Sequence, residues 1–314
     1  MENLDTNNEI AIQVKGLKKE FKHLTAVNGI DLSVRQGELF AILGPNGAGK
    51  TTTIRMLCCL SRPGSGTASI MGNDILKDPI SVKQIIDVSP QETAIAENLN
   101  ARENLNLIGG IHGFPKDVID QRATQLLEMM GLTNRSKERV KKYSGGMKRR
   151  LSIAMSLVSD PQVLFLDEPT LGLDPQSRRI IWEHIKELKG KKTIILTTHY
   201  LEEADSLADR IAIIDEGNIV ALGTPKELKD SISDKQVMIV KAKNLTPDII
   251  QDLKNIYQEV REIDDGIEIK AQELNFSEIV DYLRPKGVEI ESTSQKQITL
   301  DDVFLHLTGK ELRE

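Results

Sequence analysis

Short apolar runs rich in β-branched residues recur through the first two thirds of the chain. They occupy Leu39–Leu43 and residues 163–166, 193–196 and 211–214. Runs of this kind are typical of parallel strands that are covered on both faces of a sheet. Because helical patterns lie between them, we expect an α/β fold built on a parallel sheet.

A helix-rich stretch interrupts this alternation between residues 92 and 158. Within it, residues 117–130 show the apolar spacing of a helix, and Gly131 is a typical helix stop. We interpret the whole stretch as a helical insertion into the α/β core.

The pattern changes after a polar segment at residues 223–236. Strand and helix signals then alternate in the order β-α-β-β-α-β, which is the ferredoxin-like order, at residues 237–241, 246 onward, 261–263, 267–270, 275–283 and 288–291. A last amphipathic helix is expected at residues 300–307. We therefore predict two domains: an α/β domain with a helical insertion at residues 1–230, and a small α+β domain at residues 231–314.

Charge, hydropathy and cysteine content argue against several classes of protein and several kinds of site. The net charge of −6 lies entirely in residues 231–314, which hold 11 basic and 17 acidic side chains, so a nucleic-acid partner is not expected. No apolar run approaches the ~18 residues of a membrane span, and residues 1–8 do not resemble a signal peptide, which favours a cytoplasmic location. The two cysteines, Cys58 and Cys59, are adjacent, which disfavours a disulfide or a zinc site, and Cys58 is expected in the core.

A phosphate-binding loop follows the first apolar run. The segment Gly44-Pro45-Asn46-Gly47-Ala48-Gly49-Lys50-Thr51 fits G-x-x-x-x-G-K-[ST] at every fixed position. Glycines let backbone N–H groups close around phosphate oxygens, and the helix that follows presents its positive end to the anion. We expect Lys50 to face the phosphates and Thr51 to ligate Mg²⁺, with Thr52 completing the phosphate-binding set.

Two carboxylates end the apolar run at residues 163–166. Asp167 and Glu168 stand where parallel α/β sheets bind their ligands, at the carboxyl end of a strand. Asp167 is the expected Mg²⁺ partner, and Glu168 is free to polarise an attacking water.

The motif Tyr143-Ser144-Gly145-Gly146-Met147 closely resembles the signature of ATP-binding cassette (ABC) ATPases. The family's other motifs occur in the family's order over about residues 10–228: Phe21 as the adenine-stacking aromatic, Gln91 as the Q-loop, residues 171–174 as the D-loop and His199 as the switch histidine. The chain departs from the usual Leu-Ser-Gly-Gly-Gln at Tyr143 and Met147, and it has Phe21 where Tyr is more usual. The Ser-Gly-Gly centre is intact, and stacking needs only a ring.

This resemblance implies ATP and Mg²⁺ as cofactors and two cassettes paired head to tail, here as a homodimer. Ser144, Gly145 and Gly146 of one cassette would close on the ATP held by the other, and Asp174 would help to join the two sites. Gln91 would sense Mg²⁺ and the attacking water. His199 would contact the γ-phosphate and share the catalytic role with Glu168 and Gln91.

Seven basic residues surround the signature: Lys137, Arg139, Lys141, Lys142, Lys148, Arg149 and Arg150. Tyr143 of the signature is the single aromatic residue among them, so no series of aromatic residues is present to stack on bases. We interpret the group as a solvated face.

A single cassette without a membrane span implies a separate multi-span transmembrane subunit. Residues 92–103 are where the family's coupling groove receives a helix of that subunit. Residues 299–309 look like the ending of daunorubicin-resistance-type exporter ATPases, which implies efflux and a peripheral position on the inner face of the cell membrane. The alternatives are a soluble ABC ATPase that acts on ribosomes or DNA, and a non-enzymatic scaffold, against which the intact Glu168 and His199 argue.

Overall fold

The computed structural model describes residues 9–232, 236–257, 259–272, 274–296 and 298–310. They divide into two compact units: the described residues up to Pro225 together with those from Leu307 on, and residues 226–306. The boundary expected between residues 230 and 231 lies near the first division and stays a prediction. Within the described ranges, no helix has the length and apolar character that crossing a membrane requires.

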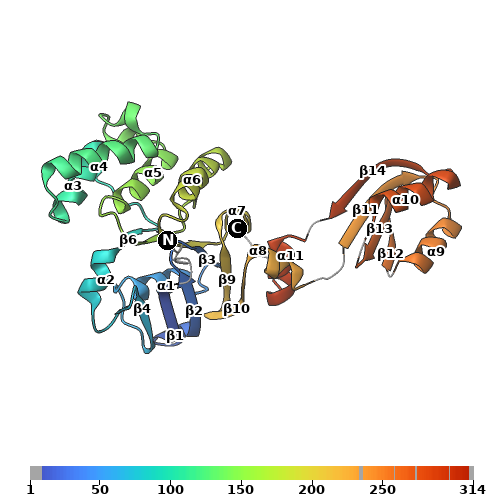
Figure 1. Cartoon of the computed structure of the whole chain (residues 1–314), viewed down its shortest axis with the longest axis horizontal. Helices are drawn as coiled ribbons and strands as arrows, with labels where there is room; N and C mark the ends of the chain where they lie inside the picture. Colours follow the sequence, from blue (N-terminus) through green and yellow to red (C-terminus); the bar gives the residue numbers. More distant parts are fainter. Residues whose placement is uncertain (1–8, 233–235, 258, 273, 297, 311–314) are drawn as a thin grey trace, which may run out of the picture. The chain divides into compact units, whose positions relative to one another are not determined.

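A six-stranded sheet in the order β10-β9-β3-β8-β7-β6 forms the centre of the larger unit (Figure 1). Its strands are β3 (Leu39–Leu43), β6 (Ile86–Ser89), β7 (Val163–Asp167), β8 (Thr193–Thr198), β9 (Arg210–Asp215) and β10 (Asn218–Gly223). Neighbouring strands from β6 to β9 are parallel, and β10 pairs antiparallel with β9. Every residue of β3, β7 and β8 is buried, which confirms the predicted parallel sheet with two covered faces.

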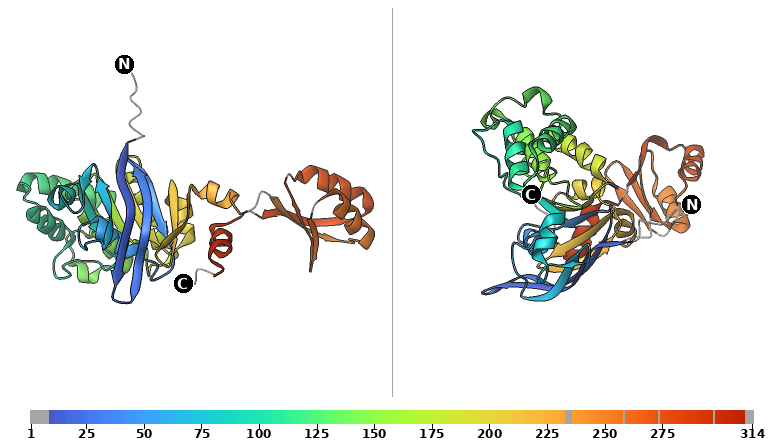
Figure 2. Two further views of the ribbon diagram at one scale, coloured as in Figure 1. Left: turned by 90° about the horizontal axis from the view of Figure 1, so that it is seen from below. Right: turned by 60° about the vertical axis from the view of Figure 1, so that its left-hand side comes forward.

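A second, antiparallel sheet in the order β2-β1-β4-β5 was not predicted. It consists of β1 (Ile10–Phe21), β2 (Leu24–Arg35), β4 (Ser65–Ile70) and β5 (Asn73–Asp74). Figure 2 shows β1 and β2 as a long antiparallel pair. One apolar core, which includes Ile12, Ile54, Phe40 and Phe165, joins this sheet, the helix α1 (Lys50–Leu57) and the parallel sheet. Cys58 belongs to the same core, as predicted.

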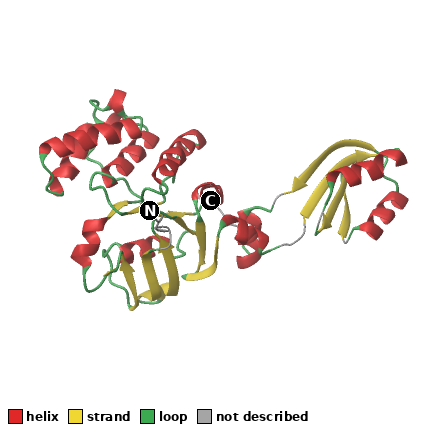
Figure 3. Ribbon diagram, in the orientation of Figure 1, coloured by secondary structure: helices red, strands yellow, loops and turns green. Residues whose placement is uncertain are grey.

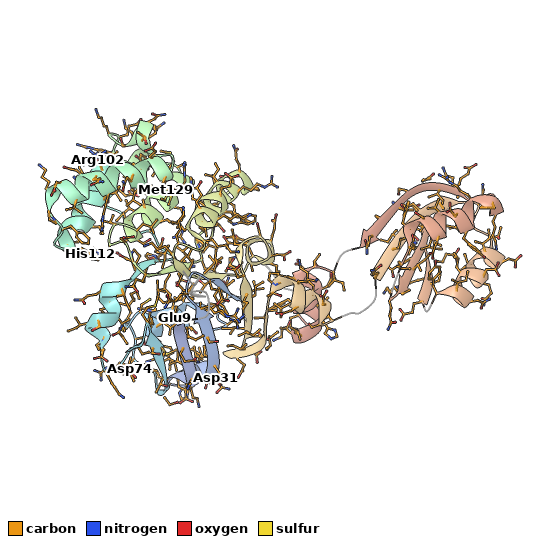
Figure 4. The ribbon with its side chains drawn as sticks, viewed as in Figure 1. Glu9, Asp31, Asp74, Arg102, His112 and Met129 are labelled. Carbon is orange, nitrogen blue, oxygen red and sulfur yellow. The ribbon has the colours of Figure 1, made fainter. Side chains whose placement is uncertain are left out.

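Helices α3 to α5 form the predicted insertion and gather on one side of the parallel sheet, away from β1 and β2 (Figures 1 and 3). The remaining elements of this unit are α2 (Pro79–Ile85), α3 (Ala101–Ile111), α4 (Lys116–Met129), the 3-10 turns Thr133–Arg135 and Val140–Lys142, α5 (Gly145–Ser156), α6 (Pro175–Leu188) and α7 (Leu201–Leu207). A capping box begins α3: the Asn100 side chain accepts from the Glu103 N–H, and the Glu103 carboxylate accepts from the Asn100 N–H. Figure 4 labels Arg102 and His112 at the two ends of this helix.

The second unit has the predicted β-α-β-β-α-β order. From α8 onward the chain forms α8 (Pro225–Asp230), β11 (Gln236–Lys243), α9 (Pro247–Ile256), β12 (Glu259–Ile263), β13 (Gly266–Ala271), α10 (Phe276–Leu283), the 3-10 turn Arg284–Lys286, β14 (Glu289–Lys296) and α11 (Leu300–Thr308). The four strands pair antiparallel in the order β12-β13-β11-β14. Val240, Leu253, Ile269 and Leu283 lie in a core of their own. The α+β ferredoxin-like prediction is therefore confirmed.

Candidate functional site

The loop between β3 and α1 closes around the ammonium group of Lys50. Lys50 Nζ donates to the carbonyls of Gly44 (2.6 Å) and Pro45 (3.1 Å), and the Ala48 N–H donates to the Pro45 carbonyl. Gly49 has a φ of +105°, and a Cβ there would lie 2.2 Å from the Ala26 carbonyl oxygen. Only glycine fits this position, which explains why the phosphate-loop pattern requires it.

Thr51 and Asp167 bring two oxygens together at the end of β7. Thr51 Oγ1 donates to Asp167 Oδ1 over 3.1 Å, and Thr197 Oγ1 donates to the same oxygen over 2.5 Å. A hydroxyl and a carboxylate are the hard oxygen donors that Mg²⁺ prefers, and Mg²⁺ usually takes its remaining ligands from phosphates and water. The described residues hold no cluster of three or more His, Cys, Asp or Glu side chains able to bind a metal, so a dedicated all-protein cage is absent from that part of the chain.

Glu168 is the centre of a buried charged group. Its Oε1 lies 3.0 Å from Lys50 Nζ, and its Oε2 lies 2.8 Å from His199 Nδ1. The three side chains are almost fully buried, so these interactions are weakly screened. Glu168 also has a φ of +49°, a left-handed conformation that non-glycine residues adopt rarely and at functional sites more than elsewhere.

One cavity of about 320 Å³ collects most of the candidate residues. Its lining comprises Phe21, Leu24, Ala26, Pro45, Asn46, Gly47, Gly49, Lys50, Thr51, Thr52, Gln91 and Glu168. Phe21 is 49% exposed at this lining, and Lys19 Nζ lies over its ring, 5.2 Å from the ring centroid. The exposed part of the ring can stack on a flat ligand. Below, the space that these residues line is called the nucleotide cavity.

Eight candidates do not line the nucleotide cavity, and four of these lie beside it. Gly44 and Ala48 belong to the phosphate loop, Asp167 contacts Thr51, and His199 contacts Glu168. The other four, Ser144, Gly145, Gly146 and Asp174, lie elsewhere. Ser144 caps α5 by accepting from the Met147 N–H, and Asp174 caps α6 by accepting from the Ser177 N–H. The Ser177 hydroxyl, followed by the Ser177 N–H, lowers the pKa of Asp174. A Cβ on Gly146 would lie 2.8 Å from Ser177 Oγ, so glycine allows α5 and α6 to approach each other. Within one chain the signature and the phosphate loop therefore form separate surfaces.

The expected solvated face is wrong for Arg149. Only 5% of this residue is exposed, and its guanidinium donates to backbone carbonyls at the ends of β6 and β7. Burial lowers the pKa of Arg149 to about 10, and the nearby carboxylates of Asp167, Glu203 and Glu168 oppose that shift. The group therefore stays charged at neutral pH.

Two further side chains that support the site, Thr197 and Glu203, were not predicted from the sequence. Thr197 contacts Asp167 through its hydroxyl and also accepts the Glu168 N–H (3.0 Å), so it supports both carboxylate residues. Glu203 is fully buried in α7, and its Oε1 accepts from Thr170 Oγ1 (2.8 Å) and Trp182 Nε1 (2.9 Å). Desolvation raises the pKa of Glu203. These hydrogen bonds attach the segment after Glu168 to the helix that follows His199.

Two family descriptions match the chain. The ABC transporter family matches residues 27–171, and the C-terminal domain of DrrA1-3-like ATP-binding proteins matches residues 223–308. The daunorubicin resistance ATP-binding protein DrrA3 of Streptomyces coeruleorubidus is 39% identical over 311 residues, which cover 97% of this chain and 98% of the relative. The linearmycin resistance ATP-binding protein LnrL of Bacillus subtilis is 36% identical over 96% of this chain and all of the relative.

Among solved structures, the chain is similar to a dimeric ATP-binding cassette bound to ADP and Pi in a post-hydrolysis state. That structure has 25% sequence identity and a TM-score of 0.62, and the similarity covers 68% of this chain and 98% of the other.

Proposed function

This chain belongs to the ATP-binding subunits of ABC transporters, in the group with a DrrA1-3-like C-terminal domain, and we propose that it powers efflux through a separate membrane-spanning subunit. It is an ATPase of the ABC type. The observation that carries the proposal is the nucleotide cavity, where Lys50, Glu168 and Gln91 line one space beside an exposed aromatic ring. The relatives named for daunorubicin and linearmycin resistance favour an exported substrate.

We assign the residue roles from these positions. Phe21 stacks on adenine, residues 44–52 hold the phosphates, and Thr51 and Asp167 would hold Mg²⁺ together with Gln91. The ion, when bound, neutralises charge that develops on the phosphate oxygens. Glu168 orients the attacking water, and His199, hydrogen bonded to Glu168, fixes the direction of that carboxylate.

We further propose that two copies of the chain complete two sites. Ser144, Gly145 and Gly146 lie outside the cavity of their own chain, so a second cassette would bring them to the γ-phosphate. Asp174, which also lies outside it, would help to join the two sites. The two exposed residues of the signature, Ser144 and Gly145, stand at the N-terminus of α5, where backbone N–H groups suit an anion. The dimeric relative bound to ADP and Pi supports this arrangement.

The membrane subunit would dock on residues 92–103, at the inner face of the cell membrane. Glu97 in this segment forms an ion pair with Lys148 of α5, and the Lys141 N–H donates to the Glu97 carbonyl, so the segment is tied to the signature helix. Residues 231–314 would then act as an accessory domain to the ATPase domain at residues 1–230.

The deciding experiment is an affinity purification of the Glu168→Gln variant with ATP and Mg²⁺ from detergent-solubilised cells of the source organism. The variant binds ATP but does not hydrolyse it, so it should hold the closed pair and its partner. Lys50→Met is the matched control, because it removes the phosphate contact and should not close. Recovery of a multi-span membrane protein with Glu168→Gln alone supports the proposal; recovery of ribosomes or DNA instead overturns it.

Charge reversal then locates the docking segment. Glu97→Lys should weaken recruitment of the membrane subunit while sparing basal ATPase activity. Arg102→Glu is a less specific probe, because Arg102 donates to the Asp120 carbonyl and to Thr124 Oγ1 across α3 and α4. The double variant Glu97→Lys/Lys148→Glu rebuilds the internal ion pair with reversed charges. If recruitment recovers in this double variant, Glu97 acts through α5 rather than through the membrane subunit.

A further inference from the structure

Arg149 uses its whole hydrogen-bonding capacity on the protein backbone. A guanidinium has five N–H donors, and the structure gives Arg149 five hydrogen bonds. The acceptors are all main-chain carbonyl oxygens: Pro169 from Nε (2.6 Å), Pro90 (2.6 Å) and Gln91 (3.1 Å) from Nη1, and Asp167 (2.8 Å) and Glu168 from Nη2. In the described part of the chain, this buried cation therefore has carbonyl dipoles as its hydrogen-bond partners instead of a carboxylate.

Three of these carbonyls belong to consecutive residues, 167–169, which we call the β7 turn. The left-handed conformation of Glu168 (φ +49°) turns the chain sharply there and is unfavourable for a non-glycine residue. The carbonyls of the β7 turn all meet the same guanidinium. Arg149 thus stabilises the strained turn that carries the catalytic carboxylate.

The turn is held from its other side as well. The Glu168 N–H donates to the Thr197 carbonyl (3.1 Å) and to Thr197 Oγ1 (3.0 Å). With its carbonyl bound by Arg149 and its N–H bound by Thr197, the backbone of Glu168 has a fixed orientation. That orientation directs the carboxylate toward Lys50 and His199.

Arg149 also connects two segments on different sides of the site, the signature helix α5 and the segment that contains Gln91. It lies in α5, three residues after Gly146, and it contacts the carbonyls of Pro90 and Gln91, where the Gln91 side chain lines the nucleotide cavity. Resting on the function proposed above, we propose that Arg149 is a positioning residue that links the signature helix and the Gln91 segment to the backbone of Glu168. A displacement of either segment then moves the catalytic carboxylate relative to the phosphates.

A purely structural role makes a different prediction. A residue that only fills the interior between α5 and the parallel sheet would lower stability when replaced, but each folded molecule would keep its turnover rate. A positioning residue lowers kcat per folded molecule and leaves ATP affinity in place, because the phosphate loop does not depend on it. The split between kcat and the dissociation constant therefore separates the two roles.

The test uses the full-length chain with Arg149→Met, which keeps an unbranched apolar side chain but loses all five N–H donors, and Arg149→Gln, which has two N–H donors. Arg150→Met is the matched control: Arg150 is the next residue of α5, it is partly buried, and it donates to the carbonyl of Met130, outside the site. We expect kcat to fall about 30–100-fold in Arg149→Met, as a misplacement of about 1 Å does. The kcat of Arg149→Gln should lie between the kcat values of Arg149→Met and the wild type, and the kcat of Arg150→Met should equal that of the wild type.

Amide hydrogen exchange gives a readout that does not need turnover. In Arg149→Met the amides of Gln91, Glu168 and Leu171 should exchange about 10-fold faster, because their segments lose an anchor, whereas Arg150→Met should leave them unchanged. Unchanged exchange at these amides, or an unchanged kcat with faster exchange, overturns the proposal. If Arg149→Met does not fold, kcat and amide hydrogen exchange are measured on Arg149→Gln instead, and they test the proposal in the same way. A wild-type chain without ATPase activity would refute the proposed function, and exchange at Glu168 and Leu171 would then decide alone whether Arg149 holds the β7 turn.

Discussion

Lys50 has two competing partners, and this competition predicts how Glu168→Gln changes ATP binding. In the structure the Lys50 ammonium pairs with Glu168 over 3.0 Å inside the protein. Lys50 is also the group that must face the β- and γ-phosphates. ATP therefore has to replace the Glu168 contact and to place phosphate charge beside a carboxylate of the same sign. Glu168→Gln removes both penalties and should bind ATP more tightly.

The distance sets the size of the effect. Two unit charges 3.0 Å apart attract by about 5–6 kcal/mol at an effective dielectric constant of 20, before any desolvation. Most of that attraction is offset because both groups are taken out of water, which leaves a net coupling of about 1–2 kcal/mol. Lys50 keeps its two carbonyl contacts in the variant, so the ammonium does not move away. We therefore expect an affinity gain of about 10-fold, or ~1.4 kcal/mol.

Isothermal titration calorimetry with ATP in EDTA measures this gain without turnover. His199→Gln is the matched control, because it removes the other partner of Glu168 and keeps the carboxylate charge and the Lys50 pair. Its ATP affinity should not rise above that of the wild type, because the competing carboxylate remains. An affinity of Glu168→Gln no higher than the wild type would refute the competition, and an equal gain in His199→Gln would show that the ion pair is not its cause.

Three further predictions concern the ring, the glycine contact and pH. Phe21→Leu should weaken ATP binding about 3–10-fold in the same titration while Phe21→Tyr leaves it unchanged, because only the ring stacks. Gly146→Ala places a Cβ 2.8 Å from Ser177 Oγ and should lower the free energy of unfolding in urea by about 1–3 kcal/mol; Ser177→Gly in the same chain should restore it. Burial lowers the pKa of His184 below 6.5, so the unfolded chain takes up this proton first. His184 therefore reduces stability as the pH falls below 6.5, and between pH 8 and 5.5 the melting temperature of the wild type should drop about 1–2 °C more than that of His184→Gln.

The local pattern of apolar and polar residues predicted the strands and helices in which one pattern continues along the whole element. The runs that became β3, β7, β8 and β9 are apolar throughout because both faces of the parallel sheet are covered. The antiparallel sheet was missed because its long strand β1 does not keep one period. Its pairing with β2 shifts register several times, and Gly16 has a φ of +57°, so apolar side chains do not alternate regularly along it.

The predicted site residues come from motifs, but the contacts among them depend on the topology of the sheet. Lys50 and Glu168 are distant in sequence, and they meet because β3, β8 and β7 are parallel neighbours whose carboxyl ends reach the same edge. Thr197 is the second-last residue of β8, the strand between them, and for that reason contacts both Asp167 and Glu168. A sequence motif identifies Lys50 and Glu168 separately, whereas their ion pair requires the strand order.

Arg149 shows why a group of like charges is a poor guide to exposure. Composition alone favours a solvated face for seven basic residues around the signature, and Arg149 was included in it for that reason. The helical period separates it from the others: Gly146, Arg149 and Ile153 stand at positions i, i+3 and i+7 of one stripe of α5, and all three are buried. Lys148 and Arg150, one residue to either side, point away from this stripe and are only partly buried. A cation on the stripe that carries the small and apolar residues of a helix must find its acceptors inside the protein, and here they are the carbonyls of the turn that holds Glu168.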